Sequence, residues 1–437
     1  MIKSLRWVGC ALCLMPALVW SSPRIEHWET TQGIPVLFVA APEIPMLTLR
    51  VVFAAGSAYD GATPGLASLT SGLLGEGTQA LSTDEFHRQM EATGAQLSAG
   101  ATRDMAWVSL RSLTDPNNAE PAQMLATAAL SRPRFAKEDF ARMRQQMLAG
   151  LQQEKGSPGS IADKAMRHAI YGDHPYARPS EGTEASVAAF ALDTVGAFYK
   201  RYYVADNALV VMVGAVTREA AARIAETLVA DLPRGGRAPA VPGVSPPIPG
   251  QSLRIDFPGE QSHILFAQPG ISRHDPDYFP LVVGNHVLGG NGPVSLLFNE
   301  IREQRGLSYS VDSSFEPMAA AGPFVIRLQT DYRREQEAQN VLQATLGAFL
   351  AAGPSEAALL AAKHNLIGGF PLRIDNNTKL MEYLTVIGFY DLPLDYLDTY
   401  PRAVEAVTAA QIREAFQRRV RIANMAQITV GPRATSP

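Results

Sequence analysis

The stretch from residue 232 to 250, LPRGGRAPAVPGVSPPIPG, restricts the possible folds more than any other part of the sequence. It contains six prolines and four glycines, and its apolar residues follow neither the helical nor the strand period. Such a composition predicts an extended linker. We therefore expect a first domain over residues 23–232, a linker over 233–250 and a second domain over 251–437, each near the commonest domain size.

The two halves repeat one order of elements. In each half, two strand-like runs precede a helix-like segment, and a last strand-like run closes the half. These segments are 35–42, 46–56, 65–78 and 208–216 in the first half, and 252–257, 262–270, 278–292 and 425–432 in the second. Strand pairs followed by runs of helices favour an α+β fold over a doubly wound sheet, and the repetition predicts a tandem duplication.

The first residues are typical of a secretory signal peptide over 1–22. A basic start precedes an apolar run over residues 7–20, which is shorter than a membrane-spanning helix needs, and small residues follow from Ser21. Both cysteines, Cys10 and Cys13, lie in this segment, and neither has the residues of a lipid-attachment site before it. We expect a periplasmic protein of a Gram-negative bacterium, without a stable membrane anchor.

Charge and cysteine content exclude several classes of function. The formal net charge is −4, and the signal peptide contributes two positive charges and no acid, so the exported chain carries −6. An acidic chain without basic patches does not favour a nucleic-acid partner. The exported chain also lacks any cysteine, so it has neither a disulfide nor a thiol nucleophile.

The segment GLASLTSGLLGEGT, residues 65–78, predicts a helix with two different faces. Its inward-facing residues at helical spacing are Leu66, Leu69 and Leu73. A second stripe is nearly without side chains and consists of Ser68, Ser71, Gly72 and Gly75. Because a glycine inside a helix costs about 1 kcal/mol relative to alanine, this stripe needs an explanation.

The second half contains a predicted helix and strand in succession. Pro293 suits the first position of a helix, Leu297 and Ile301 are expected on its inner face, and Gly306 ends it. The segment 307–315 alternates strictly, which predicts a strand. Its residues expected on one side are Leu307, Tyr309, Val311 and Phe315.

Three segments together carry a resemblance to a known family. They are TPGLASLTSGLLGEGT (63–78), DHPYARPSEGTEASVAAFALDTVGAFYKRYYVADNALVVMVG (173–214) and LGGNGPVSLLFNEIREQRGLSYSV (288–311). In this order they resemble the pitrilysin and insulin-degrading zinc metallopeptidases, the inverzincins, which include mitochondrial processing peptidase and its inactive partner subunits. The resemblance implies two homologous domains, each a mainly antiparallel sheet covered by helices, that face each other across a chamber.

The resemblance also explains the bare stripe. Active members carry H-x-x-E-H in that helix, where two histidines hold zinc and the glutamate is the general base. The matching residues here are Ser68, Ser71 and Gly72. The family's third ligand, a glutamate, would fall near Ala149 or Gly150, and Glu154 is the nearest acid, a turn further on.

Serine and glycine are not zinc ligands. No two of the eight histidines are spaced i, i+3 or i, i+4 along the chain. The resemblance therefore implies that this chain holds no metal and that zinc belongs to a partner subunit.

Two residues of the second half match the family. Its members use an arginine and a tyrosine, seven residues apart, to hold the substrate carbonyl beside the zinc, and Arg302 and Tyr309 have this spacing. Both side chains donate hydrogen bonds to an oxygen on which negative charge develops. The alternative is that Tyr309 belongs to the core and Arg302 is a solvated helix charge, and Arg305 is a second candidate for the charge.

These features favour a non-catalytic, substrate-binding subunit of a heterodimeric periplasmic zinc peptidase. The resemblance implies that a homologous subunit with H-x-x-E-H supplies zinc and general base, while Arg302 and Tyr309 hold a peptide that adds to a sheet edge. The alternative is a pseudopeptidase that acts as a peptide-binding scaffold or chaperone in the cell envelope. An independent enzyme is not favoured, because no other catalytic motif is present.

Overall fold

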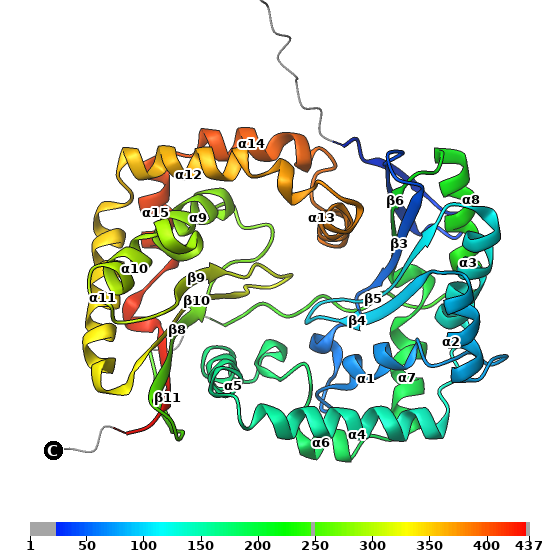
Figure 1. Ribbon diagram of the computed structural model, residues 1–437, viewed down its shortest axis with the longest axis horizontal. Coiled ribbons are helices and arrows are strands. Elements are labelled where there is room, and N and C mark those ends of the chain that lie inside the picture. The colour runs from blue at the N-terminus through cyan, green and yellow to red at the C-terminus, as the bar shows by residue number, and fades with distance from the viewer. Residues whose placement is uncertain (1–22, 246–249, 434–437) are drawn as a thin grey trace, which may run out of the picture.

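The computed structural model describes residues 23–245 and 250–433. The predicted signal peptide, residues 1–22, lies outside the described residues. The described chain is an α+β protein with two sheets and helices packed against them (Figure 1). The structure thus confirms the α+β fold class predicted from the sequence.

Six strands form the first sheet in the order β1-β2-β6-β3-β5-β4. They are β1 (Glu26–Glu29), β2 (Pro35–Ala40), β3 (Met46–Phe53), β4 (Gln96–Ala101), β5 (Ala106–Leu113) and β6 (Ala208–Gly214). Neighbouring strands are antiparallel except β2 and β6. The sequence did not predict β1, whose four residues are too few for a clear alternation.

Five strands form the second sheet in the order β7-β11-β8-β10-β9. They are β7 (Ser252–Asp256), β8 (Gln261–Pro269), β9 (Val311–Phe315), β10 (Pro323–Asp331) and β11 (Ala426–Gly431). Neighbours are antiparallel except β7 and β11. Without β1, the first sheet has this same strand order and the same parallel pair, as a tandem duplication predicts.

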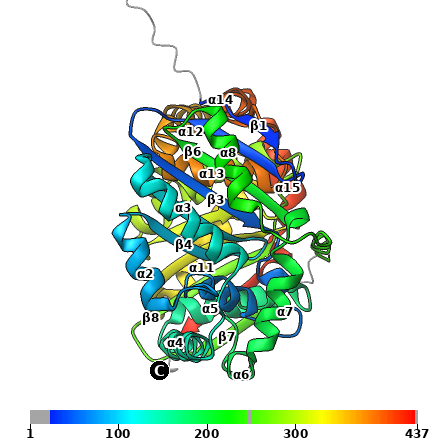
Figure 2. The same ribbon diagram turned by 90° about the vertical axis from the view of Figure 1, so that its right-hand side faces the viewer.

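Most helices of the first half lie on the outer side of its sheet. There α3 and α8 lie side by side (Figure 2). They are η1 (Ser57–Tyr59), α1 (Leu66–Leu73), α2 (Thr83–Ala92), α3 (Pro116–Ser131), α4 (Lys137–Glu154), α5 (Pro158–Tyr171), η2 (Pro175–Ala177), α6 (Glu184–Ala188), α7 (Leu192–Tyr202), η3 (Ala205–Asn207) and α8 (Arg218–Val229).

The helices of the second half include two short π-helices, η4 and η6. In chain order they are α9 (Tyr278–Asn285), η4 (His286–Gly290), η5 (Gly292–Val294), α10 (Leu296–Phe298), η6 (Asn299–Glu303), η7 (Tyr332–Arg334), α11 (Glu335–Ala352), α12 (Glu356–Gly368), η8 (Pro371–Arg373), α13 (Asn377–Phe389), α14 (Tyr396–Ala406), α15 (Ala409–Arg419) and η9 (Ile422–Asn424).

The helix predicted to start at Pro293 begins later. Pro293 lies in the short turn η5, and Ser295 is the N-cap of α10, where its hydroxyl accepts a hydrogen bond from the Phe298 backbone. The Ser295 hydroxyl pairs a backbone N–H at the start of the helix that would otherwise lack a partner. The side chain of a proline at the first helical position has no acceptor atom for such an N–H. Leu297 and Ile301 are fully buried, as predicted.

One helix of each half packs against the sheet of the other half. Helix α5 packs against β8 and β11 of the second sheet, and its Ala162 and Met166 are fully buried there. Helix α13 packs against β3 and β6 of the first sheet, and Gly388 lets it approach Leu37 and Leu209. The exchange of α5 and α13 crosses the boundary between the two predicted domains (Figure 1).

A buried carboxylate joins the two halves at their junction. Asp104, in the turn between β4 and β5, is 1% exposed. It accepts hydrogen bonds from the hydroxyl of Tyr176 at 2.5 Å, the hydroxyl of Tyr390 at 2.8 Å and the backbone N–H of Ala319 at 2.9 Å. Two segments of each half therefore meet at one side chain.

The described part of the predicted linker, residues 233–245 and 250, contains neither helix nor strand. It lies against the first half through backbone contacts. The N–H of Ala205 donates to the Pro233 carbonyl at 2.9 Å, and the N–H of Ala238 donates to the Asn207 side chain at 3.1 Å. The start of the linker is therefore fixed to the first half, whereas Val241 and Val244 pack in a cluster that also includes Ala320 and Met318 of the second half.

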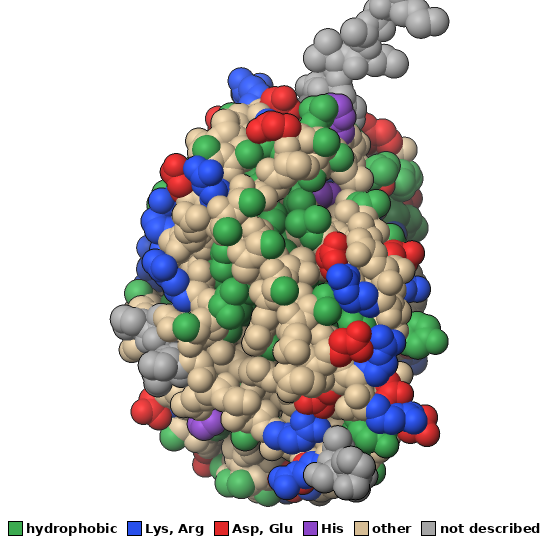
Figure 3. Space-filling view, turned by 90° about the vertical axis from the view of Figure 1, so that its left-hand side faces the viewer, with side chains coloured by type: hydrophobic (Ala, Val, Ile, Leu, Met, Phe, Trp, Pro, Cys, Tyr) green, Lys and Arg blue, Asp and Glu red, His purple; other side chains and the backbone are tan. Residues whose placement is uncertain are grey.

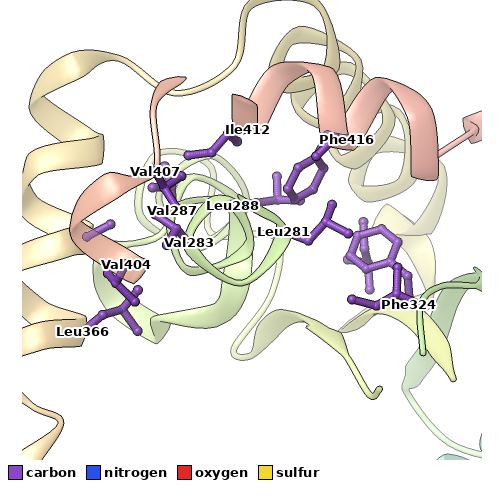
Figure 4. Close-up of a cluster of buried hydrophobic side chains, with 14 of the residues drawn as sticks. Leu281, Val283, Val287, Leu288, Phe324, Leu366, Val404, Val407, Ile412 and Phe416 are labelled. Atoms are coloured by element: carbon purple, nitrogen blue, oxygen red, sulfur yellow. The ribbon is translucent and has the colours of Figure 1, made fainter. Parts of the chain in front are cut away.

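The largest buried cluster spans both halves. Most of it lies in the second half, where α9, α12, α14, α15 and β10 meet (Figure 4), and it also includes Leu37, Val52 and Val211 of the first sheet. It includes the fully buried Leu281, Phe324 and Phe416. The outer face built by α11 and α12 shows uncharged surface across its middle (Figure 3). Among the described residues no single helix is long and apolar enough to cross a membrane; α11 and α12 pass that test only as a pair bent by 96°.

Candidate functional site

Helix α1 has the two faces that the sequence predicts. Leu66, Leu69 and Leu73 are at most 4% exposed. The hydroxyls on the other stripe are bound within the protein. Ser68 donates to the Ser180 carbonyl at 2.8 Å, and Ser71 donates to the Ser68 carbonyl at 3.0 Å.

A methionine from α4 lies where a side chain at position 72 would be. A Cβ added to Gly72 would lie 3.4 Å from Cε and 3.5 Å from Sδ of Met143. A thioether is a weak, soft donor that does not replace imidazole at a zinc site. The space beside Gly72 is therefore apolar.

The positions predicted for a third ligand also lack a donor. Ala149 is exposed on α4, and a Cβ added to Gly150 would meet no atom within 4 Å. Glu154 forms an ion pair with Lys164 of α5. Within residues 23–245 and 250–433, no three His, Cys, Asp or Glu side chains are grouped so that they could hold a metal ion. The residues at this site do not fit zinc.

A buried acid that the sequence analysis missed fixes the start of α1. Asp60 is 3% exposed, and its carboxylate accepts from the backbone N–H of Gly65 at 2.7 Å and of Ala67 at 2.8 Å. Burial raises the pKa of Asp60 to about 7, although these backbone hydrogen bonds and the charge of Arg178 lower it. The cap lies six residues before the helix, outside the usual N-cap position, so no local motif marked it.

Arg302 and Tyr309 line the same open pocket, of about 470 Å³. Arg302 is exposed at the C-terminal end of η6, and its guanidinium lies 4.7 Å from the centre of the Phe298 ring. Among the described residues it has no carboxylate partner. Arg305, the second candidate, is paired with Glu300 at 2.7 Å. Arg302 is therefore the guanidinium that is free to bind a ligand.

Tyr309 is 79% exposed, so the core alternative is wrong. The expected strand over 307–315 is shorter, because β9 begins at Val311. Before it, the Leu307 carbonyl accepts a hydrogen bond from the Thr330 hydroxyl at 2.6 Å, and the Leu307 side chain is buried. This contact anchors the segment while Tyr309 points outward, against the predicted alternation.

The rest of the pocket lining is polar and charged. Besides Arg302, Leu307 and Tyr309, it consists of Glu260, Gln261, Glu303, Gly306, Ser308, Gln329, Thr330, Asp331 and Arg334. Arg334 is held by Glu337 and Asp331 by Arg333, whereas Arg302 has no such partner in the part of the chain that the structure describes. The pocket therefore combines a free guanidinium, a phenol and backbone, which are groups that can hold a peptide carbonyl.

Comparisons with known proteins place both halves in one family. Residues 36–184 match the family model described as insulinase (peptidase family M16), and residues 189–366 match the one described as peptidase M16 inactive domain. The crystal structure of a peptidase M16 inactive domain from Pseudomonas fluorescens is 36% identical, covers 94% of this chain and 99% of its own, and has a TM-score of 0.91.

Curated relatives are more distant. An uncharacterized zinc protease of Mycobacterium leprae is 27% identical over 80% of this chain and 79% of its own length. A protein of Helicobacter pylori named non-peptidase homolog YmxG is 24% identical over 89% of this chain and 90% of its own. Together with the structural match at 36% identity, these similarities show that the chain belongs to peptidase family M16, the insulinase family.

Proposed function

We propose that this chain is the non-catalytic, substrate-binding subunit of a heterodimeric periplasmic zinc peptidase. A homologous partner with H-x-x-E-H would hold the zinc and the general base. This chain would supply Arg302 and Tyr309. The observation that carries the proposal is the contrast within one chain: α1 has no metal donor, yet Arg302 and Tyr309 lie exposed at one pocket.

The chemistry of the pair fits a role beside a borrowed metal site. A guanidinium offers positive charge and several N–H donors, and a phenol donates one O–H. When water attacks a peptide carbonyl, negative charge develops on the oxygen. Donors already in place stabilise that charge without reorganisation.

The strand β9 gives a bound peptide a place to lie. It begins two residues after Tyr309 and is the last strand of its sheet, so its outer edge has no neighbouring strand among the described residues. An extended peptide can add to such an edge through main-chain hydrogen bonds, which read little sequence.

The comparisons support a non-catalytic role and pairing with a homologous subunit. The relatives include proteins named M16 inactive domain and non-peptidase homolog. The periplasmic protease PqqL of Escherichia coli shares the fold at 17% identity and a TM-score of 0.77, and this chain spans 49% of it. The rest of PqqL is about as long as this chain. A heterodimer of this chain and a homologous partner would therefore have about the length of PqqL, divided over two chains.

The test mixes this chain with a zinc-bearing M16 protein of the same organism and measures peptide hydrolysis. Arg302→Ala and Tyr309→Phe should each lower the turnover of the mixture, by about 10²-fold for a donor to the developing charge. Arg305→Ala is the matched control, because Arg305 is held by Glu300. Unchanged turnover in the first two variants would refute their assigned role.

One observation favours the second candidate, a scaffold or chaperone without any peptidase in the assembly. Met143 lies beside Gly72, and the hydroxyls of Ser68 and Ser71 already donate hydrogen bonds within the protein, so this stripe needs no metal to pair its polar atoms. Affinity purification of the tagged chain from a periplasmic extract distinguishes the heterodimer from the scaffold. A co-purifying H-x-x-E-H protein supports the heterodimer, and its absence supports the scaffold.

A further inference from the structure

The Arg302 guanidinium is held by an aromatic ring and by no polar group of the described chain. Its Cζ lies over the Phe298 ring, 4.7 Å from the ring centre. Among the described residues, the Arg302 side chain forms no ion pair and donates no hydrogen bond. Phe298 is 7% exposed and is not one of the residues that line the pocket. Its ring therefore supports the guanidinium from the core side.

Contact with a ring leaves the N–H groups of a guanidinium available. The attraction acts between the positive charge and the electron-rich face of the ring, so it needs no hydrogen-bond acceptor. Arg305 shows the opposite case, because its guanidinium donates to the carbonyl and to the carboxylate of Glu300, at 2.7 Å each. Arg302 is thus held in position with its donors still free for a ligand.

The Phe298 ring itself has a rigid support. Ser295 is fully buried and caps α10, where its hydroxyl accepts from the Phe298 N–H at 3.4 Å and donates to the Gly292 carbonyl at 2.8 Å. The Phe298 side chain belongs to the largest buried cluster, together with Leu297 and Ile301. Because cap and core fix the ring, the ring can fix the guanidinium.

The first half has the same spacing without the charge. Both α2 and η6 are followed by a glycine with a positive φ. Phe86 and Met90 lie eight and four residues before the glycine of the first half, and both are buried in its core. Phe298 and Arg302 lie at the same two distances from the glycine of the second half. A guanidinium thus takes the place of an apolar side chain behind the same aromatic residue.

We propose that Phe298 is a positioning residue, whose ring holds the Arg302 guanidinium where a substrate carbonyl is bound. This inference rests on the proposed function of Arg302. It adds a residue outside the pocket that acts on the substrate through Arg302 alone. A residue that only fills the core contributes to stability, whereas a positioning residue also keeps the N–H donors in the productive orientation.

Phe298→Leu removes the ring and keeps an apolar side chain. In the mixture with the zinc-bearing partner, kcat should fall about tenfold, the effect of a partly desolvated contact between a cation and a ring. KM should change little, because the contact acts on charge that develops during the reaction. Phe86→Leu is the matched control, since it makes the same change at the corresponding place of the first half. It should lower the melting temperature and leave kcat unchanged.

A double-mutant cycle separates positioning from packing. If Phe298 acts through Arg302, Phe298→Leu combined with Arg302→Ala should have the kcat of Arg302→Ala alone. A further tenfold loss in the double variant would assign Phe298 to packing. That result, or an unchanged kcat in Phe298→Leu while Arg302→Ala lowers it, would overturn the positioning role and leave the proposed function in place.

NMR of the full chain alone gives a readout that needs no partner. In protein labelled with ¹⁵N-arginine, the Arg302 Nε–Hε signal is the one that Arg302→Lys removes. Phe298→Leu should lower the order parameter of this bond toward the values below about 0.6 that flexible groups show, whereas Phe86→Leu should not. Equal order parameters in the wild type and Phe298→Leu would overturn the inference, whether or not Arg302 takes part in peptide hydrolysis.

Discussion

At the scale of single residues, α1 differs from a zinc-binding helix in what its atoms can donate. A hydroxyl at Ser68 or Ser71 and a hydrogen atom at Gly72 offer no strong ligand, and zinc sites need three protein donors of the imidazole, thiolate or carboxylate type. The hydroxyls also make hydrogen bonds to the backbone. This region is therefore a packed part of the first half.

Asp60 makes stability depend on pH. Its pKa is about 7 in the folded protein against an ordinary value of 3.8, because it is buried. Since the folded state holds the proton more tightly, the contribution to stability is greatest below pH 3.8 and is lost as the pH rises through about 7. Asp60→Asn removes this dependence. Between pH 5 and pH 8, the free energy of unfolding of the wild type should fall by about 2–3 kcal/mol relative to the variant.

Urea unfolding of both proteins at the two pH values measures this difference. Asp173→Asn, at an exposed position, is the control and should follow the wild type at both pH values. A difference between wild type and Asp60→Asn that does not change with pH would contradict the assignment to Asp60.

The sequence predicted part of the site and missed part of it. The resemblance to the family, whose arginine and tyrosine are seven residues apart, pointed to Arg302 and Tyr309. The two residues line the same pocket, although their role stays a prediction. Alternation placed Tyr309 inside, because a pattern cannot show that the Leu307 carbonyl accepts a hydrogen bond from Thr330 and that the strand begins only at Val311. Asp60 and Met143 act on α1 from elsewhere in the chain, so no local motif contains them.

At the scale of elements, the exchanged helix α13 is held on the first sheet by an ion pair. Arg50 on β3 is 10% exposed and contacts Glu382 of α13 through two hydrogen bonds, of 2.7 and 3.0 Å. Glu382→Gln leaves this guanidinium without a carboxylate. Loss of a charged hydrogen-bond partner should cost about 1–3 kcal/mol in the free energy of unfolding, measured by urea titration.

Glu91→Gln is the matched control, because Glu91 is exposed on α2 and makes no ion pair among the described residues. It should leave the free energy of unfolding unchanged. If Glu382→Gln behaves like this control, the ion pair does not hold α13 in place.

The positions of helices and strands along the chain were predicted better than the surfaces against which they pack. Apolar runs and alternation predicted β2, β3 and β6 of the first sheet and β7, β8, β11 and part of β9 of the second, since those signals are local. They did not predict β1 or β10. They could not show that α5 and α13 each cover the other half's sheet, because an amphipathic helix does not specify which apolar surface it meets. The Asp104 junction joins four segments and has no signature in any one of them.

At the scale of the whole molecule, the exchange of helices should make both halves unfold together. Of the two tryptophans beyond residue 22, Trp28 packs against the core of the first half and reports on it by fluorescence, whereas Trp107 packs against the cluster shared by both halves. Leu342→Ala creates a cavity in the second half, where Leu342 is fully buried. Such a cavity costs about 2–5 kcal/mol. In a cooperative molecule it should shift the tryptophan-detected transition to lower denaturant.

Leu384→Ala on α13, which packs on the first sheet, should shift the same transition by a comparable amount. A tryptophan transition that moves with Leu384→Ala but not with Leu342→Ala would show that the halves unfold independently. The duplicated topology would then describe two separate domains that only touch.

The most direct test of the central claim is metal analysis of the full chain purified alone, combined with a peptidase assay with and without a chelator. Because α1 and α4 offer no donor set, we predict no tightly held divalent ion and no cleavage that the chelator stops. One tightly bound ion per chain, with hydrolysis that the chelator abolishes, would contradict the account.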